Sequence, residues 1–160
     1  MATMTALRPG AYGFPVSIKP RYGNFIGGEW VAPASGQYFE NVTPVTGQVL
    51  CEIPRSNAAD IDRALDAAHA AKAAWGKTSQ AQRAVMLNQI AQRMEDNLEM
   101  LATIETWDNG KPIRETRDLD VPLVARHFLH HAGWAQLQDS EFADHAPLGV
   151  IGQIVPWNFP

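Results

Sequence analysis

The residues best suited to chemistry stand near the end of the sequence, in the stretch PLGVIGQIVPWNFP at 147–160. Residues 150–155 are a short apolar run rich in β-branched side chains, which predicts a strand buried on both faces of a parallel sheet. Ligands bind beyond the carboxyl ends of such strands, where Trp157 and Asn158 follow. The Asn158 amide can donate a hydrogen bond to an oxygen that becomes negative during a reaction. Taken alone, the pair also fits a core aromatic residue and a turn former.

The same stretch resembles the signature of the NAD(P)-dependent aldehyde dehydrogenases, P-x-G-V-x-G-x-I-x-P-W-N-F-P. The resemblance covers nearly the whole chain from Tyr22 onward, through N-x-I-G-G-E-W, P-x-T-G-x-V and E-T-x-D-N-G-K-P. It implies that the chain is an amino-terminal fragment of an enzyme that oxidises an aldehyde to a carboxylic acid through a cysteine thiohemiacetal.

The resemblance also implies roles for particular residues. Asn158 matches the donor that stabilises the thiohemiacetal oxyanion, and Ile154, Val155, Pro156 and Trp157 match positions that line the site of the cofactor, which is NAD or alternatively NADP. The family's nucleophilic cysteine and its glutamate have no matching position here. We therefore expect no catalysis by this chain alone, and substrate choice cannot be read from it.

The implied fold is α/β: β-hairpins, three helices and the start of the parallel cofactor-binding sheet, left incomplete. Residues 1–20, with several prolines and glycines and no apolar period, predict a flexible arm. The resemblance implies that residues 21–160 form a partial amino-terminal cofactor-binding domain without the catalytic domain. Aromatic and β-branched residues around Gly27 and Gly28 predict a hairpin, and two further extended segments are expected at 38–42 and 48–53.

Helices are predicted from caps and apolar periodicity. The first begins near Ser56 or Asn57 with Asp60 in its first turn, and Gly76 follows its last apolar residue. A capping box at 79–82 starts a second, which runs to Trp107. Their expected apolar stripes are Ile61, Leu65, Ala68 and Trp75 in the first helix, and Met86, Leu87, Ile90, Met94, Leu98 and Leu101 in the second.

The third helical region starts at Arg114 and restarts where Asp120 can cap and Pro122 sits in the first turn. Leu123, Val124, Phe128 and Trp134 mark one broad face of it. Gly110 suits the left-handed position after the preceding helix.

Cys51 requires its own test because the chemistry of the family is cysteine chemistry. The stretch GQVLC superficially resembles the family's G-Q-x-C motif but has one residue too many. No adjacent histidine, lysine or helix start would lower the pKa of the thiol. We expect a buried strand thiol and not a nucleophile.

Two other sites invite a metal interpretation. Asp108 matches a residue that can join a monovalent-cation site in the family, but a local side-chain to backbone bond is the simpler expectation. His127 and His131 are spaced so that both could face one ion, and His130 lies between them. There is no carboxylate in an H-E-x-x-H pattern and no cysteine nearby, so we expect solvated or core histidines and no metal.

Bulk properties restrict the partners. The chain has 160 residues, of which 46% are hydrophobic and 19% charged, and a net charge of −4. No basic field for nucleic acid and no membrane span of roughly 18 apolar residues is present. The single cysteine excludes an internal disulfide, so we expect a cytoplasmic protein.

The resemblance implies a small-molecule aldehyde as substrate and a homo-oligomer for the full-length protein. Many members carry a longer alternating segment at 136–146, which forms a hairpin used in subunit assembly, so the usual arrangement of subunits stays open here. Two other classes are also open: a non-catalytic remnant that binds a full-length relative, and a nucleotide-binding module. The second is disfavoured because no phosphate-cradling loop is present.

Overall fold

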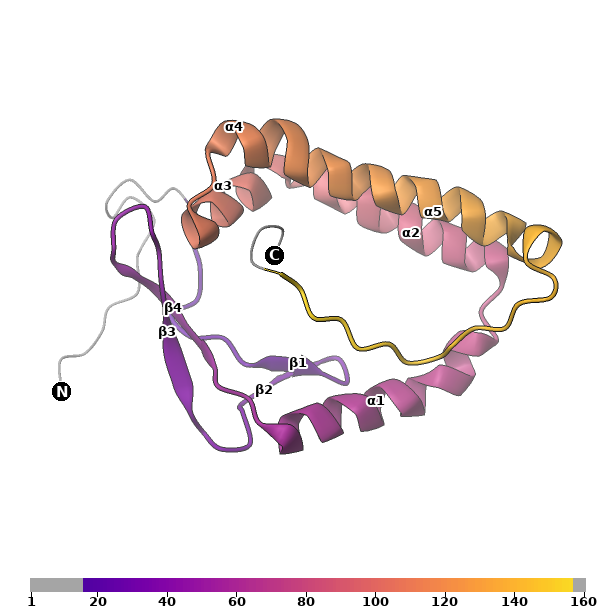
Figure 1. Ribbon diagram of the computed structural model, residues 1–160, viewed down its shortest axis with the longest axis horizontal. Coiled ribbons are helices and arrows are strands. Elements are labelled where there is room, and N and C mark those ends of the chain that lie inside the picture. Colours follow the sequence, from indigo (N-terminus) through magenta and orange to yellow (C-terminus); the bar gives the residue numbers. More distant parts are fainter. Residues whose placement is uncertain (1–15, 157–160) are drawn as a thin grey trace. The chain divides into compact units, whose positions relative to one another are not determined.

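The computed structural model describes residues 16–156 and shows a mixed α/β fold (Figure 1). The chain divides into two compact units. The first contains residues up to 71 together with 104–110, and the second contains 72–103 and 111 onward. Of the predicted arm, residues 1–15 lie outside the described part, while Val16 and Ile18 pack against the core of the first unit.

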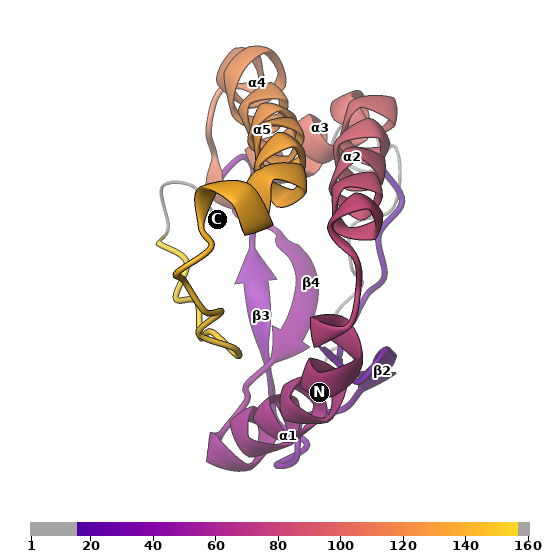
Figure 2. The ribbon, with the colours of Figure 1, turned by 90° about the vertical axis from the view of Figure 1, so that its right-hand side faces the viewer.

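Two antiparallel strand pairs form the sheets of the first unit, as the sequence predicts. β1 (Asn24–Ile26) and β2 (Glu29–Val31) are joined by Gly27 and Gly28, both with positive φ, which suits a two-residue hairpin turn. β3 (Tyr38–Val42) pairs with β4 (Val49–Pro54), and Figure 2 shows them side by side.

The core of the first unit is small and is centred on Leu50 of β4 and Trp107. Thr43, fully buried, donates its hydroxyl hydrogen to the carbonyl of Trp107. This bond ties the turn after β3 to the end of a helix that lies far along the chain, and it satisfies a polar group that burial would otherwise penalise.

Helix α1 (Ala58–Gly76) begins where the sequence predicts. The Asn57 side chain accepts a hydrogen bond from the amide of Ala59, and the Asp60 carboxylate accepts one from the amide of Asn57. The expected apolar stripe is not buried, because Ile61, Leu65 and Trp75 are all exposed.

The predicted second helix is interrupted, and the prediction of one continuous helix to Trp107 is wrong. α2 (Gln80–Asp96) has the predicted capping box between Ser79 and Gln82, but α3 (Leu98–Asn109) starts anew after Asn97. Asn97 has non-helical backbone angles, and its side chain donates to the carbonyl of Arg93 at 2.7 Å. An asparagine side chain that competes for backbone groups in this way breaks a helix.

The third helical region also differs from its prediction. A short α4 (Ile113–Glu115) leads through a π-helical turn, η2 (Thr116–Asp120), directly into α5 (Val121–Glu141). Asp120 has helical backbone angles and makes no side-chain cap bond, so the capping role assigned to it is wrong. Its carboxylate forms an ion pair with Lys111 instead.

α2 and α5 pack along each other within the second unit (Figures 1 and 2). The buried positions are small: Ala84 and Ala91 on α2 face an α5 whose buried residues are Val121, Ala125 and Ala132. The larger members of the predicted stripes are divided between exposed and half-buried positions. The exposed ones are Met86, Ile90, Val124 and Trp134, and the half-buried ones include Leu87, Met94, Leu123 and Phe128. The predicted stripes therefore coincide only in part with the buried faces, where alanines permit close approach of the helix axes.

Candidate functional site

The segment that should carry the chemistry has no regular secondary structure between residues 151 and 156. Ile151 is 72% exposed and Ile154 is 98% exposed, so the predicted buried strand does not form here. A parallel strand needs neighbours to bond its amides and carbonyls, and the described strands form only the two antiparallel pairs. The run is strand-like in composition but unpaired.

Gly149 opens this segment with a φ of +102°, a conformation that favours glycine. A Cβ atom there would lie 3.1 Å from Nζ of Lys72. Glycine therefore allows the backbone to run close to the Lys72 side chain, within the second unit. The sequence does not predict that Lys72 lies beside Gly149.

Of the predicted site residues, Ile154, Val155 and Pro156 lie in the described part, and all three are exposed. Trp157 and Asn158 lie outside the described residues. Their assignment to the cofactor site and to the oxyanion donor stays a prediction.

Cys51 is a buried thiol on β4, as the sequence predicts. Burial raises its pKa, a hydrogen bond with Asn41 lowers it, and the nearby Asp108 carboxylate raises it further. The net effect is a raised pKa, which disfavours the thiolate that nucleophilic attack requires. Cys51 is therefore unsuited to be the nucleophile.

Asp108 makes a contact that the sequence does not predict. Its carboxylate accepts a hydrogen bond from the side-chain amide of Asn41 on β3, instead of a bond to the local backbone. Asn41 stands opposite Cys51 in the β3–β4 ladder, so Asn41, Cys51 and Asp108 form one polar cluster beside the core of the first unit. Within the described residues, no group of three His, Cys, Asp or Glu side chains is placed to hold a metal.

The histidines of α5 are exposed, in agreement with one of the two predicted environments. His131 bonds through Nδ1 to the carbonyl oxygen of His127 at 2.7 Å. The indole N–H of Trp134 donates to Nε2 of His130 at 2.9 Å. The three rings therefore have different hydrogen-bonding states although they occupy adjacent positions.

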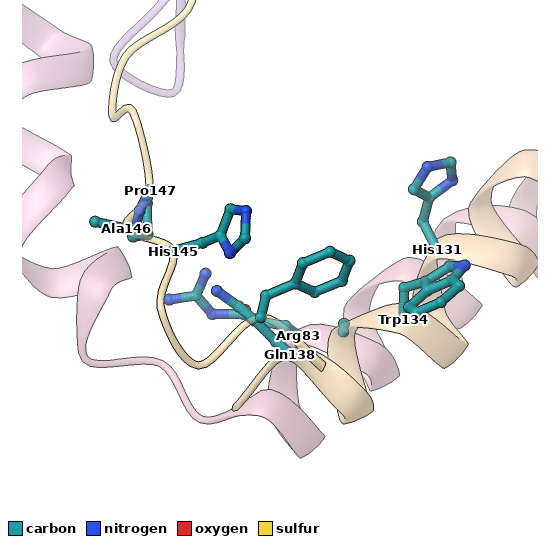
Figure 3. Close-up of a pocket in the computed structure, with 9 residues that line it drawn as sticks. Arg83, His131, Trp134, Gln138, His145, Ala146 and Pro147 are labelled. Carbon is teal, nitrogen blue, oxygen red and sulfur yellow. The ribbon is translucent and has the colours of Figure 1, made fainter. Parts of the chain in front are cut away.

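A hollow of about 380 Å³ lies at the carboxyl end of α5 in the second unit. In Figure 3, Arg83, Gln138 and His145 lie toward one end of it, and His131 and Trp134 lie toward the other. Arg83 donates to the carbonyls of Trp75 and Thr78, both at 3.1 Å, so its guanidinium connects the end of α1 to α2. The sequence does not predict this hollow, because residues 136–146 contain no recognisable motif. α5 includes the first half of that stretch, to Glu141.

Comparisons with known proteins decide the family. The sequence profile of the aldehyde dehydrogenase family matches residues 30–160. This chain belongs to the aldehyde dehydrogenase family. The match includes the PWNFP ending as well as the helices of both units.

Aldehyde dehydrogenase B of Escherichia coli is 57% identical over 164 positions, which cover 96% of this chain and 32% of that protein. Acetaldehyde dehydrogenase of Pseudomonas aeruginosa is 56% identical, covering 95% and 32%. The crystal structure of an NAD-dependent aldehyde dehydrogenase from Sinorhizobium meliloti superposes with a TM-score of 0.70 at 30% identity, covering 79% of this chain and 27% of that one.

The chain thus spans about a third of the length of these curated relatives. The alignment with the E. coli protein covers 164 positions although this chain has 160 residues, so the relative contains residues without a counterpart here. The stretch 136–146 is where the sequence predicts such a shortening. No helix in the described part is long and apolar enough to cross a membrane.

Proposed function

We propose that this chain supplies the amino-terminal part of an enzyme that oxidises an aldehyde to a carboxylic acid with NAD, or alternatively NADP, through a cysteine thiohemiacetal. The observation that carries the proposal is the family match over residues 30–160, which includes the signature at 147–160. NAD is the first choice because the S. meliloti neighbour is named NAD-dependent. The P. aeruginosa relative is named for acetaldehyde, which makes a short aliphatic aldehyde the first substrate to test.

Asn158 is the catalytic residue of this part of the enzyme. Its side-chain amide donates a hydrogen bond to the oxygen that becomes negative when a thiolate attacks the aldehyde carbon. Loss of one such donor raises the barrier by about 2.7–4 kcal/mol. The nucleophile is not Cys51, because this thiol is buried and its pKa is raised.

Ile154, Val155, Pro156 and Trp157 line the cofactor side. The first three are exposed in the described structure, so an apolar surface is available for a bound cofactor and for neighbouring strands. NAD, when bound, accepts the hydride from the thiohemiacetal. The role of these residues is to hold the nicotinamide end of the cofactor beside the reacting carbon. Assembly into a homo-oligomer is proposed only for the complete protein.

The test is a hybrid in which residues 1–160 replace the matching part of the E. coli relative, whose remaining segment supplies the rest of the fold. The hybrid should reduce NAD with acetaldehyde. Asn158→Ala should lower the single-turnover rate of NADH formation by about 10²–10³-fold and leave NAD affinity nearly unchanged. Asn88→Ala, the same chemical change on the exposed face of α2, is the matched control and should match the parent hybrid.

The possible results separate the claims. A folded hybrid that binds NAD but never reduces it would refute the proposed reaction. Equal burst rates in Asn158→Ala and its parent would refute the oxyanion role alone. Trp157→Ala should weaken NAD binding before it affects the chemical step, and unchanged binding would remove Trp157 from the cofactor site.

The exposed apolar residues at 148–155 favour a second candidate function, in which the chain binds a full-length relative without catalysing a reaction. Mixing the purified chain with the E. coli relative and measuring the mass of the product by light scattering tests this candidate. A mixture that contains only the separate components would exclude it.

A further inference from the structure

The three neighbouring histidines of α5 differ in which ring nitrogens are free. A carbonyl oxygen only accepts, so the 2.7 Å contact between His131 Nδ1 and the His127 carbonyl places a hydrogen on Nδ1. In the neutral ring, the lone pair of His131 then lies on Nε2. Bonding of one ring N–H to a backbone carbonyl is the arrangement by which proteins orient a metal-binding imidazole.

His127 can supply the second nitrogen. It stands one helical turn before His131, on the same face of α5, and both side chains are exposed. Their ring centroids lie 6.3 Å apart. Two imidazoles that bind one ion through bonds of about 2.0–2.1 Å, at angles of roughly 90–109°, bring their centroids to about 4.5–5.2 Å. The observed pair is therefore about 1 Å wider than a metal-bound pair. Rotation of the exposed His127 side chain toward His131 closes this gap.

His130 is held in a different state. Its Nε2 accepts the indole hydrogen of Trp134 at 2.9 Å, so in the neutral ring the hydrogen of His130 lies on Nδ1 and neither nitrogen offers a free lone pair. The nearby His131 ring lies 5.3 Å away edge-on, which is a packing contact. The cluster therefore divides into one pair suited to an ion and one histidine that is engaged by Trp134.

The sequence alone predicts no metal at these histidines, but the bond that orients His131 changes that expectation. We propose that His127 and His131 form a two-histidine surface site for a divalent first-row transition metal ion of the kind that imidazole prefers, such as Ni²⁺, Cu²⁺ or Zn²⁺. Two protein nitrogens leave the remaining coordination positions to water. The described residues place no third His, Cys, Asp or Glu side chain in the group, so the site is open and binds more weakly than a four-ligand structural site. The only thiol, Cys51, is buried on β4 and does not compete for the ion.

The experiment titrates Ni²⁺ into the full chain, without an affinity tag, at neutral pH by isothermal titration calorimetry. His127→Ala and His131→Ala should each weaken Ni²⁺ binding by at least about tenfold, because either change leaves a single imidazole and removes the chelate. Two matched controls exist on exposed helical positions: His130→Ala, in the same cluster, and His69→Ala on α1. Both variants should bind Ni²⁺ with an affinity within about twofold of that of the parent chain. The variant that combines His130→Ala with His69→Ala should do the same.

Circular dichroism of each variant checks that the helices remain folded. We expect them to, because the substituted side chains are exposed. Wild-type affinity in His127→Ala or His131→Ala would overturn the proposal. So would a tenfold loss in His130→Ala, because the division of the cluster by hydrogen bonding would then be wrong. Zn²⁺-induced changes in the side-chain NMR signals of His127 and His131, with His130 unchanged, are the second expected result, and a shift confined to other histidines would contradict it.

Discussion

Asp60 should hold the start of α1 to the loop that precedes β3. The side chain is almost fully buried, with 2% of its surface exposed. One carboxylate oxygen accepts from the amide of Ala34 at 2.8 Å, and the other accepts from the amide of Asn57 at 3.1 Å. The negative charge also lies in the first turn of α1, where the helix dipole favours it. Asp60→Ala removes all three interactions at once.

The expected cost of Asp60→Ala follows from these contacts. A hydrogen bond to a charged group contributes about 1.5–3 kcal/mol, so two bonds set an upper range of about 3–6 kcal/mol. Ala34 and Asn57 themselves lie at the surface, so water can replace part of what their amides lose. We expect a net loss of about 2–4 kcal/mol for Asp60→Ala. Asp60→Asn keeps one carbonyl acceptor and should lose about half as much.

Amide hydrogen exchange in the first unit provides the measurement. A loss of about 2–4 kcal/mol corresponds to roughly 30- to 1,000-fold faster exchange, since each 1.4 kcal/mol is about tenfold. The exchange rate of the Ala34 amide reports the local loss of stability. The exchange rates of the β3–β4 amides show whether the rest of the first unit is destabilised as well. Asp62→Ala, on an exposed position of the same helix, should change exchange by no more than about twofold. Unchanged exchange at Ala34 in Asp60→Ala would refute this reasoning.

Three further predictions concern the backbone, the thiol and the exposed segment. Gly110→Ala should destabilise the chain by at least about 1–2 kcal/mol in urea unfolding, because φ is +82° there and the added Cβ would lie 2.8 Å from Cγ of Pro44, whereas Gly76→Ala should not destabilise it. Cys51 should react with iodoacetamide more slowly than a free cysteine, and its rate by mass spectrometry should rise only as the pH approaches the raised pKa of the thiol or when urea exposes it. Light scattering should show that the chain self-associates, and substitution of serine at three apolar positions of the exposed segment should reduce this association. Those positions are Leu148, Ile151 and Ile154.

The features predicted correctly from sequence are those that depend on nearby residues. Gly27 and Gly28 specify a hairpin through their own backbone angles, and the capping box at Ser79 joins groups only three residues apart. The left-handed glycine at 110 likewise follows from its own conformation. Each of these choices is made within one turn of chain, so the rest of the fold is not needed to predict it.

Two of the wrong predictions depended on partners that sequence periodicity does not specify. The stripe of α2 was assigned to its largest side chains, but the fully buried positions of α2 are Ala84 and Ala91. Asp120 has the residue type and position of a cap, yet Lys111 pairs with its carboxylate and the chain stays helical through it. In both cases a tertiary contact overrides a local preference, and only the structure identifies that contact.

The unpaired segment at 150–156 connects these structural results to the proposed chemistry. An oxyanion donor accelerates a reaction only if it is fixed before the charge develops, because reorganisation during the step would consume the gain. Ile154 is 98% exposed, so the backbone leading to Asn158 is held by no surrounding sheet in the described structure. Pairing of this run with neighbouring strands would bury its apolar side chains, each contributing about 1.5–3 kcal/mol when fully covered. The same pairing would fix the position of the Asn158 amide. In the proposed mechanism, burial of the strand and preorganisation of the Asn158 donor are therefore one structural event. Substitutions that weaken strand pairing in the complete protein should then lower the rate of thiohemiacetal formation even though they touch no reacting atom.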